Sequence, residues 1–136
     1  MVIDASSLIK YLFKERNWLK IEEQLLKEEV HTIDHAAKEL LNALWKSTTL
    51  YKIFTEDIAI EKWKLFKKLI GEKVIILENQ EELLEEALQI ALSHQITVYD
   101  ALYLAQANKL KAPLLTSDQK QANAAKKMNI NTIFIE

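Results

Sequence analysis

The sequence predicts a three-layer α/β fold in which a short parallel sheet of about five strands is flanked by helices. The chain has 136 residues, of which 49% are hydrophobic, so it can bury a substantial core. Short aliphatic runs alternate along it with longer amphipathic stretches. Strands separated by helices pair in parallel through right-handed crossovers. Because no Gly/Pro/Ser-rich linker interrupts the pattern, we expect residues 1–136 to form a single domain.

The first half of the chain alternates two strands with four helices. Ser6 or Ser7 is expected to cap the first helix, and Asp34 the long helix that follows the second strand. Gly71, the single glycine, lies where the C-terminus of a helix favours a left-handed residue. The expected elements are strand 2–3, helix 6–13, helix 18–26, strand 30–33, helix 35–45 and helix 56–70.

The second half of the chain contains the other three strands. The run 74–77 is aliphatic and mostly β-branched, which favours extended backbone. The stretch 99–109 is apolar on nearly all sides, so we expect a central, buried helix. The remaining elements are helix 81–93, strand 113–116, helix 118–127 and strand 130–135.

The composition excludes several kinds of active site. One glycine cannot build a P-loop, a dinucleotide-binding turn or a nucleophile elbow. With no cysteine, thiol catalysis, disulfides and Cys-based zinc or iron–sulfur sites are also excluded. No apolar run approaches the roughly 18 residues of a membrane span, and Asp4 interrupts the N-terminal run where a signal peptide would be apolar. We therefore expect a cytoplasmic protein that works with oxygen ligands, lysines and a few histidines.

Four carboxylates are expected at one edge of the sheet. Asp4 follows the first strand and Asp118 the fourth, while Asp100 opens the buried helix and Glu39 lies near the start of another. The carboxyl ends of parallel strands and the following helix N-termini share an edge, where α/β proteins place their sites. Each acid also has an ordinary explanation as a helix cap, turn residue or solvated glutamate. Together, however, they would repel one another unless a cation offsets their charge, and all-oxygen ligands suit Mg²⁺ or Mn²⁺.

These residues carry a resemblance to a known family. The chain resembles the PIN-domain family over its whole length, and its motif order and size are similar to the VapC-type toxin branch. The motifs are Val2-Ile3-Asp4-Ala5-Ser6, Glu39-Leu40-Leu41-Asn42-Ala43-Leu44, Tyr99-Asp100-Ala101-Leu102-Tyr103-Leu104-Ala105 and Leu114-Leu115-Thr116-Ser117-Asp118. A further acid that some relatives carry shortly after the fourth has no counterpart in residues 119–122.

The resemblance implies a metal-dependent endoribonuclease that hydrolyses RNA with a metal-activated water. It places Asp4, Glu39, Asp100 and Asp118 on the family's metal-binding acids, with Asp4 and Asp100 as the primary ligands. Ser6 and Thr116 fall on hydroxyl positions that often line the site. The toxin branch usually forms homodimers and is held inactive by a small cognate antitoxin.

The other polar residues give weaker signals. Lys120 closely follows Asp118, where a substrate phosphate could pass. His31 and His35 are four residues apart but are expected in a strand and at a helix start, which is not the spacing of a helical metal pair. We interpret them as rim or structural histidines.

Two alternative functions remain open on the sequence alone. A PIN-like nuclease of RNA processing or decay would have the same acids but no antitoxin. A non-catalytic α/β binding module would show no Mn²⁺-dependent cleavage of any RNA. A receiver-type domain is disfavoured because Asp4 is followed by Ala5 rather than by a second acid.

Overall fold

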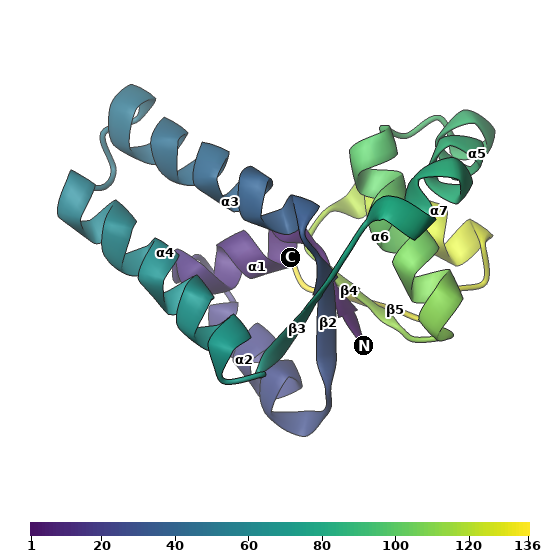
Figure 1. The fold of residues 1–136 in the computed structure, drawn as a ribbon, viewed down its shortest axis with the longest axis horizontal. Helices are drawn as coiled ribbons and strands as arrows, with labels where there is room; N and C mark the ends of the chain where they lie inside the picture. The colour runs from purple at the N-terminus through teal and green to yellow at the C-terminus, as the bar shows by residue number, and fades with distance from the viewer.

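The computed structural model describes residues 1–136 and contains one five-stranded sheet, in the order β3-β2-β1-β4-β5 (Figure 1). All neighbouring strands are parallel. This confirms the predicted sheet. The strands are β1 (Val2–Ile3), β2 (Val30–Ile33), β3 (Ile75–Glu78), β4 (Leu114–Thr116) and β5 (Thr132–Phe134).

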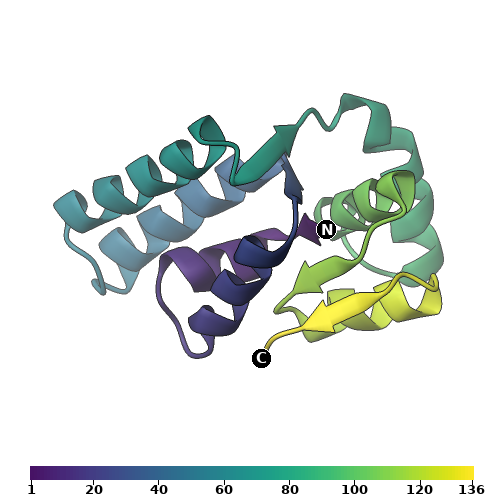
Figure 2. The ribbon, with the colours of Figure 1, turned by 90° about the horizontal axis from the view of Figure 1, so that it is seen from below.

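Helices cover both faces of the sheet. The first four lie on one side and the last three on the other (Figure 1). Helices α3 and α4 run side by side away from the sheet as a helical hairpin (Figure 2). The helices are α1 (Ala5–Leu12), α2 (Trp18–Lys27), α3 (His35–Trp45), α4 (Glu56–Gly71), α5 (Leu84–His94), α6 (Val98–Leu110) and α7 (Gln119–Lys127). A π-helical turn (Lys46–Leu50) extends α3, and a 3₁₀ turn (Glu81–Leu83) precedes α5.

The strand order reverses beside β1. From β1 the chain moves to β2 and β3 with α1 to α4 on one face, and then crosses to β4 and β5 with α5 to α7 on the other. Strands β1 and β4 are therefore neighbours although more than a hundred residues separate them. Such a topological switch point leaves a crevice at the carboxyl ends of the two strands.

The core is continuous from the sheet to both helical layers. Helix α6 packs against β1, β2 and β4, and every residue from Ala101 to Ala107 is buried. This confirms the expected central helix. No helix of the protein combines the length and the apolarity that crossing a membrane would require.

Two expected helix caps are wrong. Ser6 and Ser7 lie inside α1, which is capped instead by Asp4, whose carboxylate accepts the Ser7 N–H at 2.9 Å. Asp34 precedes α3 as expected, but its side chain accepts the N–H of Gln80 at 3.2 Å rather than one from its own helix. A partner from a distant segment thus replaces the local cap.

The expected left-handed backbone conformation of Gly71 is also wrong. Gly71 is the last residue of α4 and does not have a positive φ. The left-handed residue is Lys73, with φ of 58°, two positions later. A Cβ added at Gly71 would meet no atom within 4 Å. Neither backbone conformation nor space therefore requires glycine at this position.

Candidate active site

Four carboxylates from distant parts of the chain line one pocket where β1 and β4 end. The pocket has a volume of about 230 Å³. Asp4 follows β1 and Asp118 follows β4, while Asp100 lies in the first turn of α6 and Glu39 in the second turn of α3. The structure thus brings together all four acids singled out in the sequence. The other residues of the pocket wall are Ala5, Ser6, Ile9, Tyr103 and Gln121.

Asp4 is buried at the floor of this arrangement, with 1% of its surface exposed. Its Oδ1 accepts the Ser7 N–H, and its Oδ2 accepts the Thr116 hydroxyl at 2.5 Å. The Ser6 hydroxyl lies within 2.7 and 2.9 Å of the two carboxylate oxygens. Burial raises the pKa of Asp4 from 3.8 to about 6, against the opposing effect of these hydrogen bonds. The two hydroxyl residues singled out in the sequence therefore fix the orientation of this carboxylate.

Glu39 faces Asp4 and Asp100 from the other helical layer. Burial raises its pKa from 4.5 to about 7, and the charges of Asp100 and Asp4 add to this effect. The Tyr103 hydroxyl donates to Glu39 Oε1 at 2.8 Å and partly opposes the rise. Because its pKa lies near neutrality, Glu39 can both hold and release a proton at physiological pH.

Asp100 and Asp118 sit at the N-termini of two helices. Burial raises the pKa of Asp100, and the charge of Asp118 adds to the rise. Asp118 caps α7 by accepting the Gln121 N–H at 2.9 Å. Thr97 caps α6 by accepting the Asp100 N–H at 3.1 Å. Asp118 and Asp4 are therefore helix caps, as their ordinary explanation predicts, and both also lie on the pocket wall.

Two polar residues of the pocket wall, Tyr103 and Gln121, were not singled out in the sequence. Tyr103 is 1% exposed and holds Glu39, and Gln121 is 2% exposed and donates from its amide to the backbone carbonyl of Asp100 at 2.9 Å. Each lies three positions after an acid at a helix start, a spacing that places two side chains on the same helix face. The three-residue spacing from Asp100 and Asp118 is the sequence signal that could have identified Tyr103 and Gln121 as site residues.

Lys120 lies near the pocket but not on its wall. Its side chain is exposed, and its positive charge lowers the pKa of Asp100. Among the charges that shift the pKa values of Asp4, Glu39 and Asp100, that of Lys120 is the only positive one. The pocket therefore holds more negative charge than the chain itself offsets.

The donor set of the pocket suits a divalent cation with hard oxygen ligands. Carboxylate and hydroxyl oxygens are the ligands that Mg²⁺ and Mn²⁺ prefer. A cation would also offset the carboxylate repulsion that adds to the effect of burial on the pKa values of Glu39 and Asp100. No three acidic or histidine side chains are already arranged as a metal centre.

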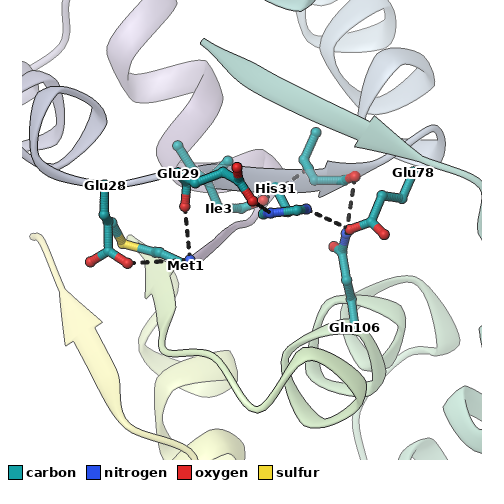
Figure 3. Close-up of polar contacts among 8 residues, drawn as sticks. Met1, Ile3, Glu28, Glu29, His31, Glu78 and Gln106 are labelled. Carbon is teal, nitrogen blue, oxygen red and sulfur yellow. Dashed lines mark hydrogen bonds and ion pairs between the residues drawn. The ribbon is translucent and has the colours of Figure 1, made fainter. Parts of the chain in front are cut away.

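The two histidines of this region have different surroundings. His31 lies away from the pocket, with Nε2 at 2.7 Å from Glu29 and Nδ1 at 2.8 Å from Glu78 (Figure 3). Gln106 donates to the same Glu78 oxygen and to the backbone of β2 (Figure 3). This network joins β2, β3 and α6, so His31 is structural. His35 lies at the pocket rim, with Nε2 at 3.4 Å from Glu39.

Comparison with known proteins gives one family and several relatives. The model of the PIN domain family matches residues 1–127. The chain is 36% identical over 126 residues to Ribonuclease VapC3 of Pyrobaculum aerophilum, and the match covers 90% of this chain and 92% of that protein.

Three solved structures share the fold. The crystal structure of PAE2754 from Pyrobaculum aerophilum has a TM-score of 0.66 at 22% identity, covering 90% of this chain and 82% of that one. A toxin–antitoxin complex from Klebsiella pneumoniae has a TM-score of 0.63 at 16% identity, with 88% of each chain covered. FitAcB from Neisseria gonorrhoeae has a TM-score of 0.59 at 16% identity, covering 98% of this chain and 96% of that one.

Proposed function

The chain belongs to the PIN-domain family, and from this premise we infer that it is a metal-dependent endoribonuclease of the VapC type, the toxin of a toxin–antitoxin pair. The observation that carries the proposal is the convergence of Asp4, Glu39, Asp100 and Asp118 on one pocket at the switch point of the sheet. The 36% identity to a named VapC ribonuclease supports RNA as the substrate.

Asp4 and Asp100 are the proposed primary ligands of Mg²⁺ or Mn²⁺, with Glu39 and Asp118 binding directly or through water. When bound, the ion would offset the carboxylate charge, bind a phosphate oxygen and lower the pKa of water. Ser6 and Thr116 hold Asp4 in one orientation, so that little reorganisation accompanies binding.

Glu39 has a distinct proposed part in the reaction. Tyr103 donates to its Oε1 and holds the carboxylate beside Asp4 and Asp100, where it could accept a proton from the attacking water. Lys120, exposed beside Asp100, is placed to meet a phosphate of the RNA backbone. We also propose that residues 1–136 form a single domain, which carries all four acids.

The partners we propose are a second copy of the chain and a small antitoxin. The α3–α4 hairpin exposes large apolar side chains that the chain itself does not cover, among them Trp45 at 52% and Ile53 at 67% exposure. Apolar surface of this kind is typical of protein–protein contacts. A toxin that cleaves cellular RNA would act in the cytoplasm.

Co-expression and purified protein test the proposal together. Wild type alone should arrest growth, whereas Asp4→Asn alone, or wild type with the product of a small neighbouring reading frame, should not. In vitro, wild type should cleave single-stranded RNA with Mg²⁺ or Mn²⁺ and lose this activity in EDTA. Asp57→Asn is the matched control, since Asp57 is an exposed acid in the first turn of α4. RNA cleavage by Asp4→Asn at the wild-type rate would contradict the proposal.

A further inference from the structure

A second pocket adjoins the acidic one, and Glu39 lines both. It has a volume of about 240 Å³, and its walls are His35, Lys38, Glu39, Asn42 and Tyr99. We call it the rim pocket. Four of these residues lie on α3 at positions three or four apart, so they form one face of that helix. Tyr99 comes from the start of α6, immediately before Asp100.

The aromatic wall of the rim pocket is held in place. The rings of His35 and Tyr99 are stacked, with centroids 4.8 Å apart and planes 7° from parallel. The His35 side chain is only 15% exposed, whereas Tyr99 is 60% exposed. A single exposed aromatic residue is common on protein surfaces. A ring fixed by stacking, on a residue adjacent to a catalytic acid, is instead a rigid platform open to solvent.

The polar wall of the rim pocket offers varied hydrogen-bonding groups. Asn42 presents a carbonyl acceptor and an amide donor, and Lys38 presents a positive charge. Both side chains are exposed. An amide can pair with the edge of a nucleobase, and an ammonium group suits the neighbouring phosphate.

We propose that the rim pocket binds an unpaired nucleobase of the RNA, next to the phosphate that the acidic pocket holds, by stacking on Tyr99. This rests on the proposed ribonuclease function and specifies its substrate as single-stranded at that position. Unpaired bases stack on aromatic side chains, whereas a base inside a duplex does not expose its face. Asn42 would then favour some bases over others.

Mononucleotides test the base site without any cleavage. Affinities for AMP, UMP and ribose 5-phosphate are measured by NMR titration with Mg²⁺ present. For the wild type, a nucleobase should improve binding about tenfold over ribose 5-phosphate, as expected for one stacked base. Tyr99→Ala should remove this difference and Tyr99→Phe should retain it. Equal binding of AMP and ribose 5-phosphate to the wild type, or an undiminished difference in Tyr99→Ala, would overturn the proposal.

The matched control is Tyr51→Ala. Tyr51 is 64% exposed, close to the value for Tyr99, but follows the π-turn at the far end of α3. This variant should keep the tenfold preference for a nucleobase. If Tyr99 instead packs against a second copy of the chain, Tyr99→Ala will change the mass measured by light scattering and the wild type will show no nucleobase preference, which overturns the base site.

Cleavage kinetics link the base site to the reaction. On a single-stranded oligoribonucleotide that the wild type cuts, Tyr99→Ala should raise KM about tenfold and change kcat less than about twofold. An oligoribonucleotide that lacks the base beside the cut bond should have a KM about tenfold higher for the wild type. For Tyr99→Ala the KM should not depend on that base, because the variant and the missing base remove the same contact. Additive losses would contradict the proposal. If no RNA is cut, the ribonuclease function fails while a nucleobase preference in mononucleotide binding still stands.

Discussion

Replacing Asp4 by asparagine should stabilise the metal-free protein at alkaline pH while abolishing its activity. The carboxylate of Asp4 is 1% exposed, and its charge is confined in the pocket with those of three other acids. Burial raises its pKa from 3.8 to about 6, which means that ionising it in the folded state costs free energy. Asparagine has nearly the same shape and carries no charge.

The size of the effect follows from the same two pKa values. At 1.36 kcal/mol per pKa unit, the rise from 3.8 to about 6 corresponds to about 3 kcal/mol of stability lost on ionisation. Because the pKa is raised on folding, this stability is fully present below pH 3.8 and is lost as the pH rises to about 6. Asparagine loses the strong acceptor of the Thr116 hydroxyl, at a cost of about 1 kcal/mol. The net gain for Asp4→Asn above pH 7 is therefore about 2 kcal/mol.

Urea unfolding in EDTA at pH 4.5 and pH 8 measures this gain. Asp4→Asn should be more stable than the wild type at pH 8 and no more stable at pH 4.5. Asp57→Asn should not gain stability at either pH and should lose up to about 1 kcal/mol at pH 8, because it removes an exposed charge from the first turn of α4. Excess Mg²⁺ should reverse the order at pH 8, since only the wild type keeps both proposed primary ligands, Asp4 and Asp100. A stability difference that is independent of pH, or a less stable Asp4→Asn at pH 8, would refute the reasoning.

Three further predictions concern other parts of the molecule. Tyr103→Phe removes the hydrogen bond that lowers the pKa of Glu39, so the acid limb of the plot of kcat/KM against pH should move to higher pH. An acid limb at the same pH as in the wild type would show that Glu39 does not take part in the proton transfer. His31→Gln should lower the free energy of unfolding by about 1 kcal/mol, because it breaks the contacts to two glutamates, and RNA cleavage should stay within about twofold. Gly71→Ala should stabilise the protein by about 0.5–1 kcal/mol in thermal unfolding, because position 71 is helical and a Cβ there meets open space; a loss of stability would show that glycine is needed.

The sheet, the central helix and the place of the four acids could be predicted because each depends on a short stretch of sequence. The strand before Asp4 is a buried apolar run, and the stretch that follows Asp100 is apolar on nearly all sides of a helix. The rule that sites lie where parallel strands end then needs only the order of the elements. Bringing Asp4 and Asp118 to one pocket required no knowledge of any individual contact.

The parts that could not be predicted depend on contacts between distant segments. The side chain of Asp34 has the chemistry of a cap but binds Gln80, 46 positions away. Tyr103 looks like one more core residue of α6 until Glu39 is placed opposite its hydroxyl. The stack of His35 on Tyr99 joins two helices that the sequence does not show to be neighbours. Periodicity identifies which face of a helix is buried but not which polar group it meets.

The scarcity of glycine and the use of helix caps have a common physical basis in this site. Glycine loops bind phosphate by bringing backbone N–H groups directly to it. Here the N–H groups at the starts of α1 and α7 are donated instead to the carboxylates of Asp4 and Asp118. Those N–H groups help to hold the carboxylates at the pocket, and a cation bound there would carry the contact to phosphate. The helix N-termini would thus act on phosphate indirectly, through the carboxylates and the cation that they bind. Phosphate chemistry of this kind needs no glycine loop, which fits a chain with one glycine.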